Sequence, residues 1–395
     1  MRFGLERIRA LVSALGMPQH RFASIHVVGT NGKSSVTEIA AAVLEAHGMS
    51  AGAYVSPHEE RWAERIRIRG AEIDPAAFGA AVERVAQAVE AVNRKLEPGE
   101  SVTQFEADTA TAFVALAAAR VEAAVIEAGL GGRLDATNVL PSTVTALTSI
   151  GLEHTQWLGD TEVEIAAEKL AVLRDHTILV LGPVPPEVEA LARRTASERS
   201  ARLVTVRDLS PAVELSNPAP YVRRNFAVAL AAADALLGGL EAERVRGVAA
   251  GLELHGRMEV LDANPPTVLD AAHNPAGAAA LAEALPPVAA GRPIIGCLAV
   301  LADKDVGGIL AALGPVLAGM VATEVPPERL ASAGRPGARA LAAEELAAAA
   351  RAAGVGWVEA AAAPAGAVAR AREMAELQGG VLLVAGSHYL LRYAS

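Results

Sequence analysis

Short apolar runs rich in β-branched residues alternate along this sequence with longer stretches rich in alanine and leucine. This alternation is typical of a parallel β-sheet whose strands are connected by helices, so the sequence predicts an α/β fold. Because the apolar runs contain few polar residues, we expect helices to cover both faces of the sheet. The predicted strands are residues 24–28, 123–127, 143–149, 177–181, 267–270, 293–298 and 380–385. The predicted helices include residues 34–47, 75–94, 107–120 and 161–173.

The length of 395 residues suggests two or three domains, at about 150 residues each. The pattern of elements starts afresh after His255-Gly256, so we predict an N-terminal domain over 1–254 and a smaller C-terminal domain over 255–395. A content of 52% hydrophobic and 20% charged residues excludes a disordered chain. No apolar run approaches the roughly 18 residues of a membrane span, so we expect no membrane association.

Charge and cysteine content exclude further classes. The 35 basic and 45 acidic residues give a net charge of 35 − 45 = −10, which argues against general nucleic-acid binding. The single cysteine, Cys297, excludes a disulfide framework and a cysteine-based metal cluster. Charges within residues 1–9 argue against a signal peptide, and apolar residues between 5 and 15 have helical spacing. We therefore predict a cytoplasmic protein whose first element is an amphipathic helix.

A glycine-containing turn with a lysine lies between the first predicted strand and the helix at 34–47. Its residues are Gly29, Thr30, Asn31, Gly32, Lys33, Ser34 and Ser35. Backbone N–H groups of such a turn, the helix N-terminus and a lysine together bind a triphosphate, and a serine hydroxyl can face magnesium. The strict P-loop pattern has glycine where this chain has Val27, so an ordinary strand–helix turn remains the alternative.

Polar residues follow three more predicted strands. Glu127 ends the strand at 123–127, His154 follows the strand at 143–149, and Asp270 ends the strand at 267–270. Ligands bind at this edge of parallel sheets, and a carboxylate there suits magnesium. Each residue could instead cap a local turn, and Lys169 on the helix at 161–173 could be a solvated lysine. Because such residues occur in both predicted domains, we expect ATP and an acceptor to meet in a cleft between them.

Together these motifs resemble the folylpolyglutamate synthase/dihydrofolate synthase family, a branch of the ATP-dependent, amide-forming Mur ligases. The resemblance rests on residues 4–8, 29–35, 56–58, 64–66, 105–106, 127–138, 151–161, 168–169, 224–225, 256–257, 270–275, 303–305 and 386–387. Ser56-Pro57-His58 and the block at 127–138 distinguish this branch from the cell-wall ligases. The resemblance implies a P-loop-containing, Mur-ligase-like N-terminal domain and a Rossmann-like C-terminal domain that acts as the glutamate ligase.

The resemblance also implies roles for individual residues. The turn at 29–35 would bind the triphosphate of ATP, with Lys33 taking part in catalysis. The further ATP-binding positions are Asn225, Arg257 and Asp270, with Arg257 reaching across the cleft. Magnesium would be held by Ser56, Glu127 and His154, and a second magnesium by carbamylated Lys169. The acceptor site would include Thr103, Gln104, Phe105, Glu106, Leu134, Asp135 and Ala136. His273 would assist binding or deprotonation of the amine.

The implied reaction is ATP-dependent addition of L-glutamate to folate-type carboxylates through an acyl phosphate. The expected partners are folate or dihydropteroate, L-glutamate and ATP, and we expect a monomer. Whether a monovalent cation is needed, and which of Ser34 and Ser35 faces magnesium, stays open. Relatives carry a segment before residues 4–8 that contacts dihydropteroate in bifunctional members, so dihydrofolate formation is less secure than polyglutamylation. The alternatives are a Mur-type ligase acting on a UDP-linked cell-wall precursor and a non-catalytic ATP-binding regulator.

Overall fold

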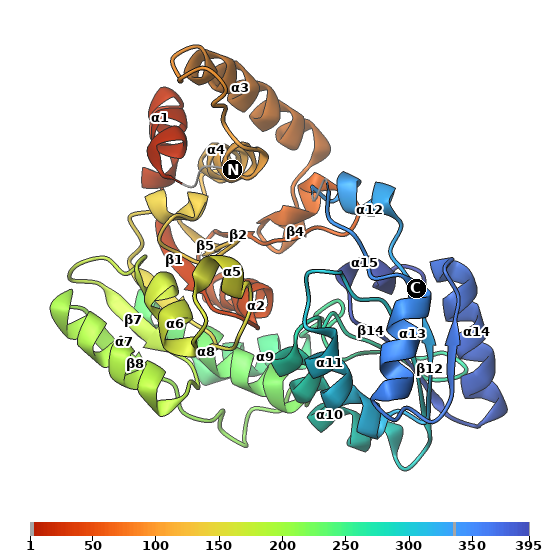
Figure 1. The fold of residues 1–395 in the computed structure, drawn as a ribbon. Helices are drawn as coiled ribbons and strands as arrows, with labels where there is room; N and C mark the ends of the chain where they lie inside the picture. The colour runs from red at the N-terminus through yellow and green to blue at the C-terminus, as the bar shows by residue number, and fades with distance from the viewer. Residues whose placement is uncertain (1–3, 335–336, 395) are drawn as a thin grey trace. The chain divides into compact units, whose positions relative to one another are not determined.

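A computed structural model describes residues 4–334 and 337–394 of the chain, which form two compact units (Figure 1). Unit 1 contains the chain up to Ser216 together with Arg223–Leu252. Unit 2 contains Asn217–Val222 and the chain from Glu253 onward. The chain therefore passes between the units three times, and the short segment Asn217–Val222 distinguishes this division from a single cut at residue 254.

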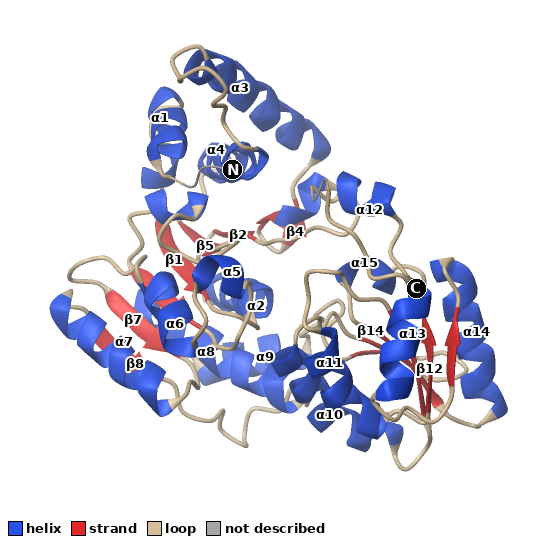
Figure 2. Ribbon diagram, in the orientation of Figure 1, coloured by secondary structure: helices blue, strands red, loops and turns tan. Residues whose placement is uncertain are grey.

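Unit 1 is built on an eight-stranded sheet with the order β4-β3-β2-β5-β1-β6-β7-β8. Figure 2 shows strands of this sheet in red and helices in blue. Its strands are β1 (Ala23–Val28), β2 (Ala51–Tyr54), β3 (Ile66–Ile68), β4 (Ala71–Glu72), β5 (Ala123–Glu127), β6 (Val144–Leu147), β7 (Ile178–Leu181) and β8 (Arg202–Thr205). Its helices are α1 (Glu6–Ala14), α2 (Lys33–Ala46), α3 (Pro75–Asn93), α4 (Gln104–Ala118), α5 (Thr155–Leu158), α6 (Glu162–Leu170), α7 (Pro186–Glu198), α8 (Pro220–Leu237) and α9 (Ala242–Ala250). The first residues of α8 belong to unit 2.

Strand β1 lies at the centre of this sheet and pairs in parallel with β5 on one side and β6 on the other. The carboxyl ends of these three strands therefore meet at one edge, where parallel sheets bind ligands. The first predicted helix, the predicted α/β class and the covering of the strands are confirmed. Helices α1, α3 and α4 pack over β2 and β5, and α6 and α7 pack over β6 and β7. Helix α2 packs on β2 and β5 from the other face.

Some helix boundaries follow from capping residues that are visible in the sequence. Thr161 caps α6 by accepting a hydrogen bond from the Glu164 N–H, and the Glu164 carboxylate accepts one from the Thr161 N–H. Asn274 caps α10 (Pro275–Ala289) by accepting a hydrogen bond from the Gly277 N–H. Both caps can be read from the local sequence, because a capping box and an Asn-Pro pair are signals that need no distant partner.

Strand β2 escapes the sequence prediction because it contains no β-branched residue. Strand β2 reads Ala-Gly-Ala-Tyr, yet all four of its residues are buried between β3 and β5. A Cβ atom on Gly52 would lie only 2.3 Å from a Leu116 methyl group of α4. Gly52 therefore lets α4 approach the sheet closely, and burial rather than β-propensity makes this segment a strand.

Unit 2 is built on a six-stranded sheet with the order β13-β12-β11-β14-β10-β9, in which β9 alone runs antiparallel to its neighbour. Its strands are β9 (Glu259–Leu261), β10 (Thr267–Leu269), β11 (Ile294–Leu298), β12 (Gly319–Ala322), β13 (Val358–Ala360) and β14 (Val381–Ala385). Its helices are α10, α11 (Val306–Leu313), α12 (Pro327–Ser332), α13 (Ala343–Ala352), α14 (Pro364–Leu377) and α15 (His388–Leu391). Helix α14 packs on β11, β12 and β14, whereas α13 packs on β12 and β13. Within the described ranges, no helix has both the length and the apolar character needed to cross a bilayer.

Candidate active site

The turn between β1 and α2 has the backbone shape of a phosphate-binding loop. Gly32 adopts a positive φ of 84° directly before Lys33, the first residue of α2. Gly29 has φ 151°, and a Cβ atom there would collide with the Thr148 side chain. Both glycines are therefore required by the turn, which directs the N-terminus of a 14-residue helix toward the ligand edge of the sheet.

The segment after β6 holds this turn in place. The hydroxyl groups of Thr148 and Ser149 both donate to the Asn31 carbonyl, at 2.7 and 3.0 Å. The Asn31 N–H donates to Ser149 Oγ at 3.0 Å, and the Thr30 N–H donates to the Ser149 carbonyl at 2.8 Å. Sequence analysis treated residues 148 and 149 only as the end of a strand, because their partners lie more than 100 positions earlier.

Two lysines and one glutamate surround the carbonyl of Gly29. Lys33 Nζ donates to the carbonyls of Gly29 and Thr30 at 3.1 and 2.9 Å. Lys169 Nζ donates to the same Gly29 carbonyl at 2.8 Å and to Glu153 Oε1 at 2.8 Å. The Lys169 side chain is only 2% exposed, so the solvated-lysine alternative is wrong. Lys169 instead lies beside the turn at 29–35.

Glu153 was not predicted as a site residue. Burial alone would raise the pKa of its carboxyl, but the charges of Lys169 and Lys33 outweigh that effect and lower the pKa to about 2. Burial in turn lowers the pKa of Lys169, although the attraction of Glu153 opposes the shift. Glu153 is thus an ionised carboxylate that pairs with Lys169 and is further stabilised by the charge of Lys33.

Glu127 ends β5 with both carboxylate oxygens in use. The Ser34 hydroxyl donates to Oε1 at 3.2 Å, and the Ser56 N–H donates to Oε2 at 3.1 Å. Residues from the phosphate-binding turn, from β5 and from the segment after β2 therefore converge here. Carboxylate and hydroxyl oxygens are ligands that Mg²⁺ prefers, and phosphate oxygens usually complete its octahedral coordination. The residues present fit a magnesium ion bound together with a nucleotide.

The remaining predicted residues near the turn at 29–35 differ from one another in what their side chains contact. Ser34, not Ser35, contacts Glu127, since the Ser35 side chain is buried in α2. The Asn225 side chain of α8 lies against Gly32, where it would obstruct a Cβ atom. His154 precedes α5 in a left-handed conformation, with φ 47°. No cluster of three or more His, Cys, Asp or Glu side chains suited to a metal occurs in the described part of the chain.

The small size of the glycines after Glu127 suggests open space for substrate, but neighbouring groups fill that space. A Cβ atom on Gly129 would lie 2.3 Å from the ring of Phe105, which fills that space. A Cβ atom on Gly132 would lie 2.7–2.9 Å from the backbone of Glu168 and Lys169. Gly132 therefore allows the end of α6, with Lys169, to pack directly against the segment that follows β5.

Most residues predicted to contact the acceptor form hydrogen bonds or packing contacts within the protein itself. Thr103 caps α4, and Glu106 Oε2 accepts hydrogen bonds from the Thr103 N–H at 2.7 Å and from Arg7 Nε at 3.1 Å. Glu106 is buried by this pairing. Gln104 is exposed at the start of α4, and Leu134 is 43% exposed. Of this group, Gln104 and Leu134 are the side chains that solvent reaches most readily.

Asp135 belongs to a buried polar chain that reaches the central strand. Its Oδ2 accepts from the Leu130 N–H, and its Oδ1 accepts from the Thr137 hydroxyl. The Thr137 oxygen in turn accepts from His26 Nε2 at 2.8 Å, because its own proton is given to Asp135. This network fixes the loop that carries Leu134 and Ala136, so the described role of Asp135 is to shape the loop.

The same network makes the stability of the protein sensitive to acid. Burial, reinforced by the charge of Arg174, lowers the pKa of His26 from 6.5 to about 3. Among the described atoms, its second nitrogen, Nδ1, has no hydrogen-bond partner. The unfolded chain therefore binds a proton below pH 6.5 that the folded chain refuses until about pH 3. Folding stability from this group is complete above pH 6.5 and is lost as the pH falls toward 3.

We expect His26 to lower the free energy of unfolding by about 2 kcal/mol between pH 7 and pH 5. Urea unfolding at the two pH values measures this loss. The matched variant His26→Gln has no titrating ring and should lose about 2 kcal/mol less over the same interval. An equal loss in both proteins would contradict the assignment of acid sensitivity to His26.

In unit 2, Asp270 is buried with its oxygens occupied. Its Oδ2 accepts from the Tyr221 hydroxyl at 2.5 Å and from the Met258 N–H at 2.8 Å, and Oδ1 accepts from the Ala272 N–H at 2.8 Å. Burial raises the pKa of Asp270 and of Tyr221. Asp270 thus ties the segment 217–222 to the turn that carries Arg257. Sequence analysis missed Tyr221, whose partner is 49 residues away.

His273 follows β10 close to the end of β14. Its Nδ1 lies 2.8 Å from the Ala271 carbonyl, so Nδ1 carries the proton and Nε2 is the basic nitrogen of the neutral ring. The rings of His273 and His388 are 5.8 Å apart. Ser387 caps α15 immediately before His388. Two histidines therefore lie together where β10 and β14, which are neighbours in the sheet, end.

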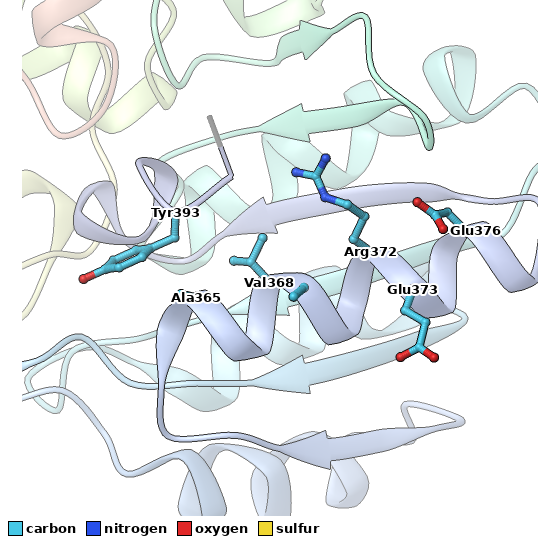
Figure 3. A pocket seen from close by; sticks show the side chains of 7 residues that line it. Ala365, Val368, Arg372, Glu373, Glu376 and Tyr393 are labelled. Atoms are coloured by element: carbon cyan, nitrogen blue, oxygen red, sulfur yellow. The ribbon is translucent and has the colours of Figure 1, made fainter.

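A separate hollow of about 270 Å³ lies along α14 (Figure 3). Its lining residues include Ala365, Val368, Arg372, Glu373, Glu376 and Tyr393. None of them is a predicted site residue, and the three charged side chains come from the C-terminal half of one helix. The hollow is thus distinct from the strand ends that carry the candidate site.

Comparisons with known proteins find the same family that the sequence motifs resemble. A family model for the Mur ligase glutamate ligase domain matches residues 256–388. The chain is 36% identical over 358 residues to a dihydrofolate synthase/folylpolyglutamate synthase of Mycobacterium tuberculosis, covering 81% of this chain and 74% of that one.

Solved structures agree with this match. Mycobacterium tuberculosis folylpolyglutamate synthase complexed with ADP and AMPPCP has a TM-score of 0.91 at 32% identity, covering 100% of this chain and 95% of that one. A bifunctional folylpolyglutamate synthase/dihydrofolate synthase of Yersinia pestis, complexed with AMPPNP and a Mn ion, has a TM-score of 0.84 at 28% identity, covering 99% and 92%.

Proposed function

Because the chain belongs to the dihydrofolate synthase/folylpolyglutamate synthase family of Mur ligases, we propose that it joins L-glutamate to folate-type carboxylates at the expense of ATP. The observation that carries this proposal is the convergence of Ser34 and Ser56 on Glu127, beside the phosphate-binding turn. That arrangement suits a nucleotide triphosphate with its divalent ion. Magnesium bound there would offset the negative charge of the phosphates and of the acceptor.

The chemistry has two steps. The acceptor carboxylate attacks the γ-phosphorus of ATP, ADP leaves, and an acyl phosphate forms. The amine of L-glutamate then attacks the acyl carbon, loses a proton, and phosphate departs with the electrons of the broken C–O bond. The first step is needed because a carboxylate is a poor acyl donor at neutral pH. Neither step requires a covalent bond to the protein, so positioning and charge stabilisation carry the catalysis.

The residues of unit 1 supply that charge stabilisation. The N–H groups of the turn at 29–35 and the N-terminus of α2 face the phosphates, and Thr148 and Ser149 keep the turn rigid. Lys33 exchanges its bonds to the Gly29 and Thr30 carbonyls for phosphate oxygens. Asn225, against Gly32, would contribute to the nucleotide site, and Ser56, Glu127 and His154 would hold magnesium.

In unit 2, Arg257 and Asp270 serve nucleotide binding, Asp270 by fixing the turn that presents Arg257. The basic Nε2 of His273 assists binding or deprotonation of the glutamate amine.

Phe105, Gln104 and Leu134 line the acceptor site, while Thr103, Glu106, Asp135 and Ala136 shape the segments that carry them. The family of the chain supports these assignments.

Lys169 is proposed to be carbamylated in the active enzyme. The neutral amine reacts with carbon dioxide, forming an N–C bond and releasing a proton, and burial favours the neutral amine by lowering the pKa of Lys169. A carbamate would bring negative charge next to Glu153, so the two groups need a cation between them. A second magnesium ion meets that need.

We further propose a cytoplasmic monomer that binds neither nucleic acid nor membranes. A net charge of −10 supports the absence of nucleic-acid and membrane binding, since no excess of basic residues is available for phosphate backbones or anionic lipids. Elution from a sizing column at about 40.5 kDa would agree with a monomer, and elution at twice that mass would contradict it.

Phosphate release by the purified protein tests the function. With ATP, Mg²⁺ and L-glutamate present, we expect release when tetrahydrofolate is the acceptor, and also with dihydropteroate if the enzyme is bifunctional. Omitting glutamate should abolish release, because the acyl phosphate is shielded from water. Assays with potassium or sodium as the only monovalent cation decide whether one is required. A folded, ATP-binding protein that releases no phosphate with either acceptor would contradict the proposal and favour a UDP-linked acceptor or a regulator.

A further inference from the structure

The segment after β2 forms a compact loop that carries Ser56. We call residues 55–65 the Ser56 loop. Its far end is closed by Glu64, whose carboxylate accepts hydrogen bonds from the N–H groups of Glu59 and Arg61, each at 2.8 Å. Its ends are joined by a hydrogen bond from the Val55 N–H to the Arg65 carbonyl at 2.9 Å. The loop is therefore a closed unit that can be moved or held as a whole.

Arg65, the last residue of this loop, contacts two other side chains of the loop. Its Nε donates to His58 Nδ1 at 2.8 Å, and its guanidinium group lies 4.5 Å from the centre of the Trp62 ring. The ring of Trp62 is in turn 4.4 Å from the ring of His58. Because Arg65 donates to Nδ1, the neutral His58 ring carries its proton on Nε2. Arg65 thus fixes the side chain of His58, two residues from Ser56.

An acidic residue outside the loop anchors Arg65. Asp108 Oδ2 accepts a hydrogen bond from the Arg65 guanidinium group at 3.0 Å, and the Arg65 side chain is only 8% exposed. Asp108 lies in α4, whose start is fixed by the Thr103–Glu106 capping box and by the buried pair of Glu106 with Arg7. A rigid helix therefore presents a carboxylate to Arg65 of the Ser56 loop.

We propose that Asp108 is a positioning residue that holds the Ser56 loop, through Arg65 and His58, in the place where Ser56 meets Glu127. This inference rests on the proposed function, in which Ser56 and Glu127 bind magnesium. Hydrogen bonds join Asp108 of α4 to Arg65 and Arg65 to His58. The backbone then leads from His58 through Pro57 to Ser56, whose N–H donates to Glu127 at 3.1 Å. Second-layer residues of this kind commonly change metal affinity by about 10- to 100-fold.

The electrostatics of the Arg65–Asp108 pair favour a role in positioning the loop over a role in stabilising the fold. Burial raises the pKa of Asp108 to about 7, although the charge of Arg65 opposes the shift. Taking two charges out of water costs free energy that their attraction repays only in part. An apolar pair of similar size would therefore serve folding equally well, but it would not orient His58 through a directed hydrogen bond.

The test combines metal affinity with a spectroscopic report on the loop. We expect Asp108→Asn to raise the Mg²⁺ concentration needed for half-maximal ADP binding by about tenfold, measured by calorimetry. In a background with Trp157→Phe and Trp357→Phe, Trp62 is the only tryptophan left of the three in the chain. Its emission should move to longer wavelength and its quenching by acrylamide should increase, because the loop is no longer held. Asp108→Glu should restore both readings in part.

A matched control removes an ion pair that has no link to the site. Glu189→Gln breaks the exposed pair with Arg193 on α7 and should change neither reading. If Asp108→Asn does not fold, the double variant Arg65→Met with Asp108→Leu replaces it, since removing both charges leaves no unpaired group. An unchanged Mg²⁺ requirement or an unchanged Trp62 signal would overturn the inference. A wild-type protein whose ADP binding does not depend on Mg²⁺ would instead contradict the proposed function.

Discussion

Replacing Lys33 by alanine should lower the rate of glutamate-dependent phosphate release at least a thousandfold, which corresponds to about 4 kcal/mol of transition-state stabilisation. Lys33 supplies a mobile positive charge at the N-terminus of α2. Its ammonium group rests on the carbonyls of Gly29 and Thr30, from which it can reach phosphate oxygens. The loss should appear mainly in kcat, because charge on the transferred phosphoryl group changes most in the transition state.

The measurement is steady-state phosphate release, with circular dichroism and urea unfolding to show that the fold is kept. Lys95→Ala is the matched control, because Lys95 is an exposed lysine just after α3, and its removal should leave the rate unchanged. A Lys33→Ala enzyme that retains a near-normal rate would refute the assignment of the turn at 29–35 to the triphosphate.

Replacing Lys169 by alanine should lower the rate about a hundredfold or more, because the change removes a group that lies between the phosphate-binding turn and Glu153. If the active enzyme carries a carbamate, added formate or acetate should restore part of the rate by placing a carboxylate in the vacated space. Added methylamine should restore none, since it would supply an ammonium group instead.

Acetate and methylamine distinguish the carbamylated state of Lys169 from its ammonium state, because each state predicts rescue by a different one of the two compounds. Rescue by methylamine and not by acetate would show that the ammonium form, paired with Glu153, is the active one. Full activity without any addition would remove Lys169 from the mechanism altogether. Independent evidence comes from carbon NMR of wild-type protein in labelled bicarbonate, where a carbamate gives a resonance that Lys169→Ala lacks.

The fold was predictable wherever the signal is local. The apolar runs at β1, β5 and β7 predicted central strands, and the capping box at Thr161 predicted the start of α6. Strand β2 could not be predicted, since alanine and glycine become a strand there only because α4 packs closely on Gly52. Strand β13 lies within an alanine-rich region that reads as helical, and it is a strand because it pairs with β12.

The candidate site was predictable to the level of residue type. Glycine, lysine and serine at 29–35, and a carboxylate at the end of β5, indicate phosphate and magnesium chemistry in any parallel sheet. Sequence could not choose between Ser34 and Ser35, because that choice depends on which face of α2 looks toward Glu127. The sequence also could not identify Glu153 as a site residue, because its low pKa depends on the charges of Lys169 and Lys33, which only the fold brings near it.

The sequence by itself determined the α/β class, the central strands of unit 1, the turn at 29–35 with its glycines, lysine and serines, and the family of the chain. Those properties depend on residues that are near one another along the chain. The tertiary structure decided what each polar side chain does. Glu106 pairs with Arg7, 99 positions away, and Asp135 supports His26 through Thr137, whereas Glu127 remains at the ligand edge of the sheet. A buried polar group must find a hydrogen-bond partner, and only the folded chain determines which partners lie within reach.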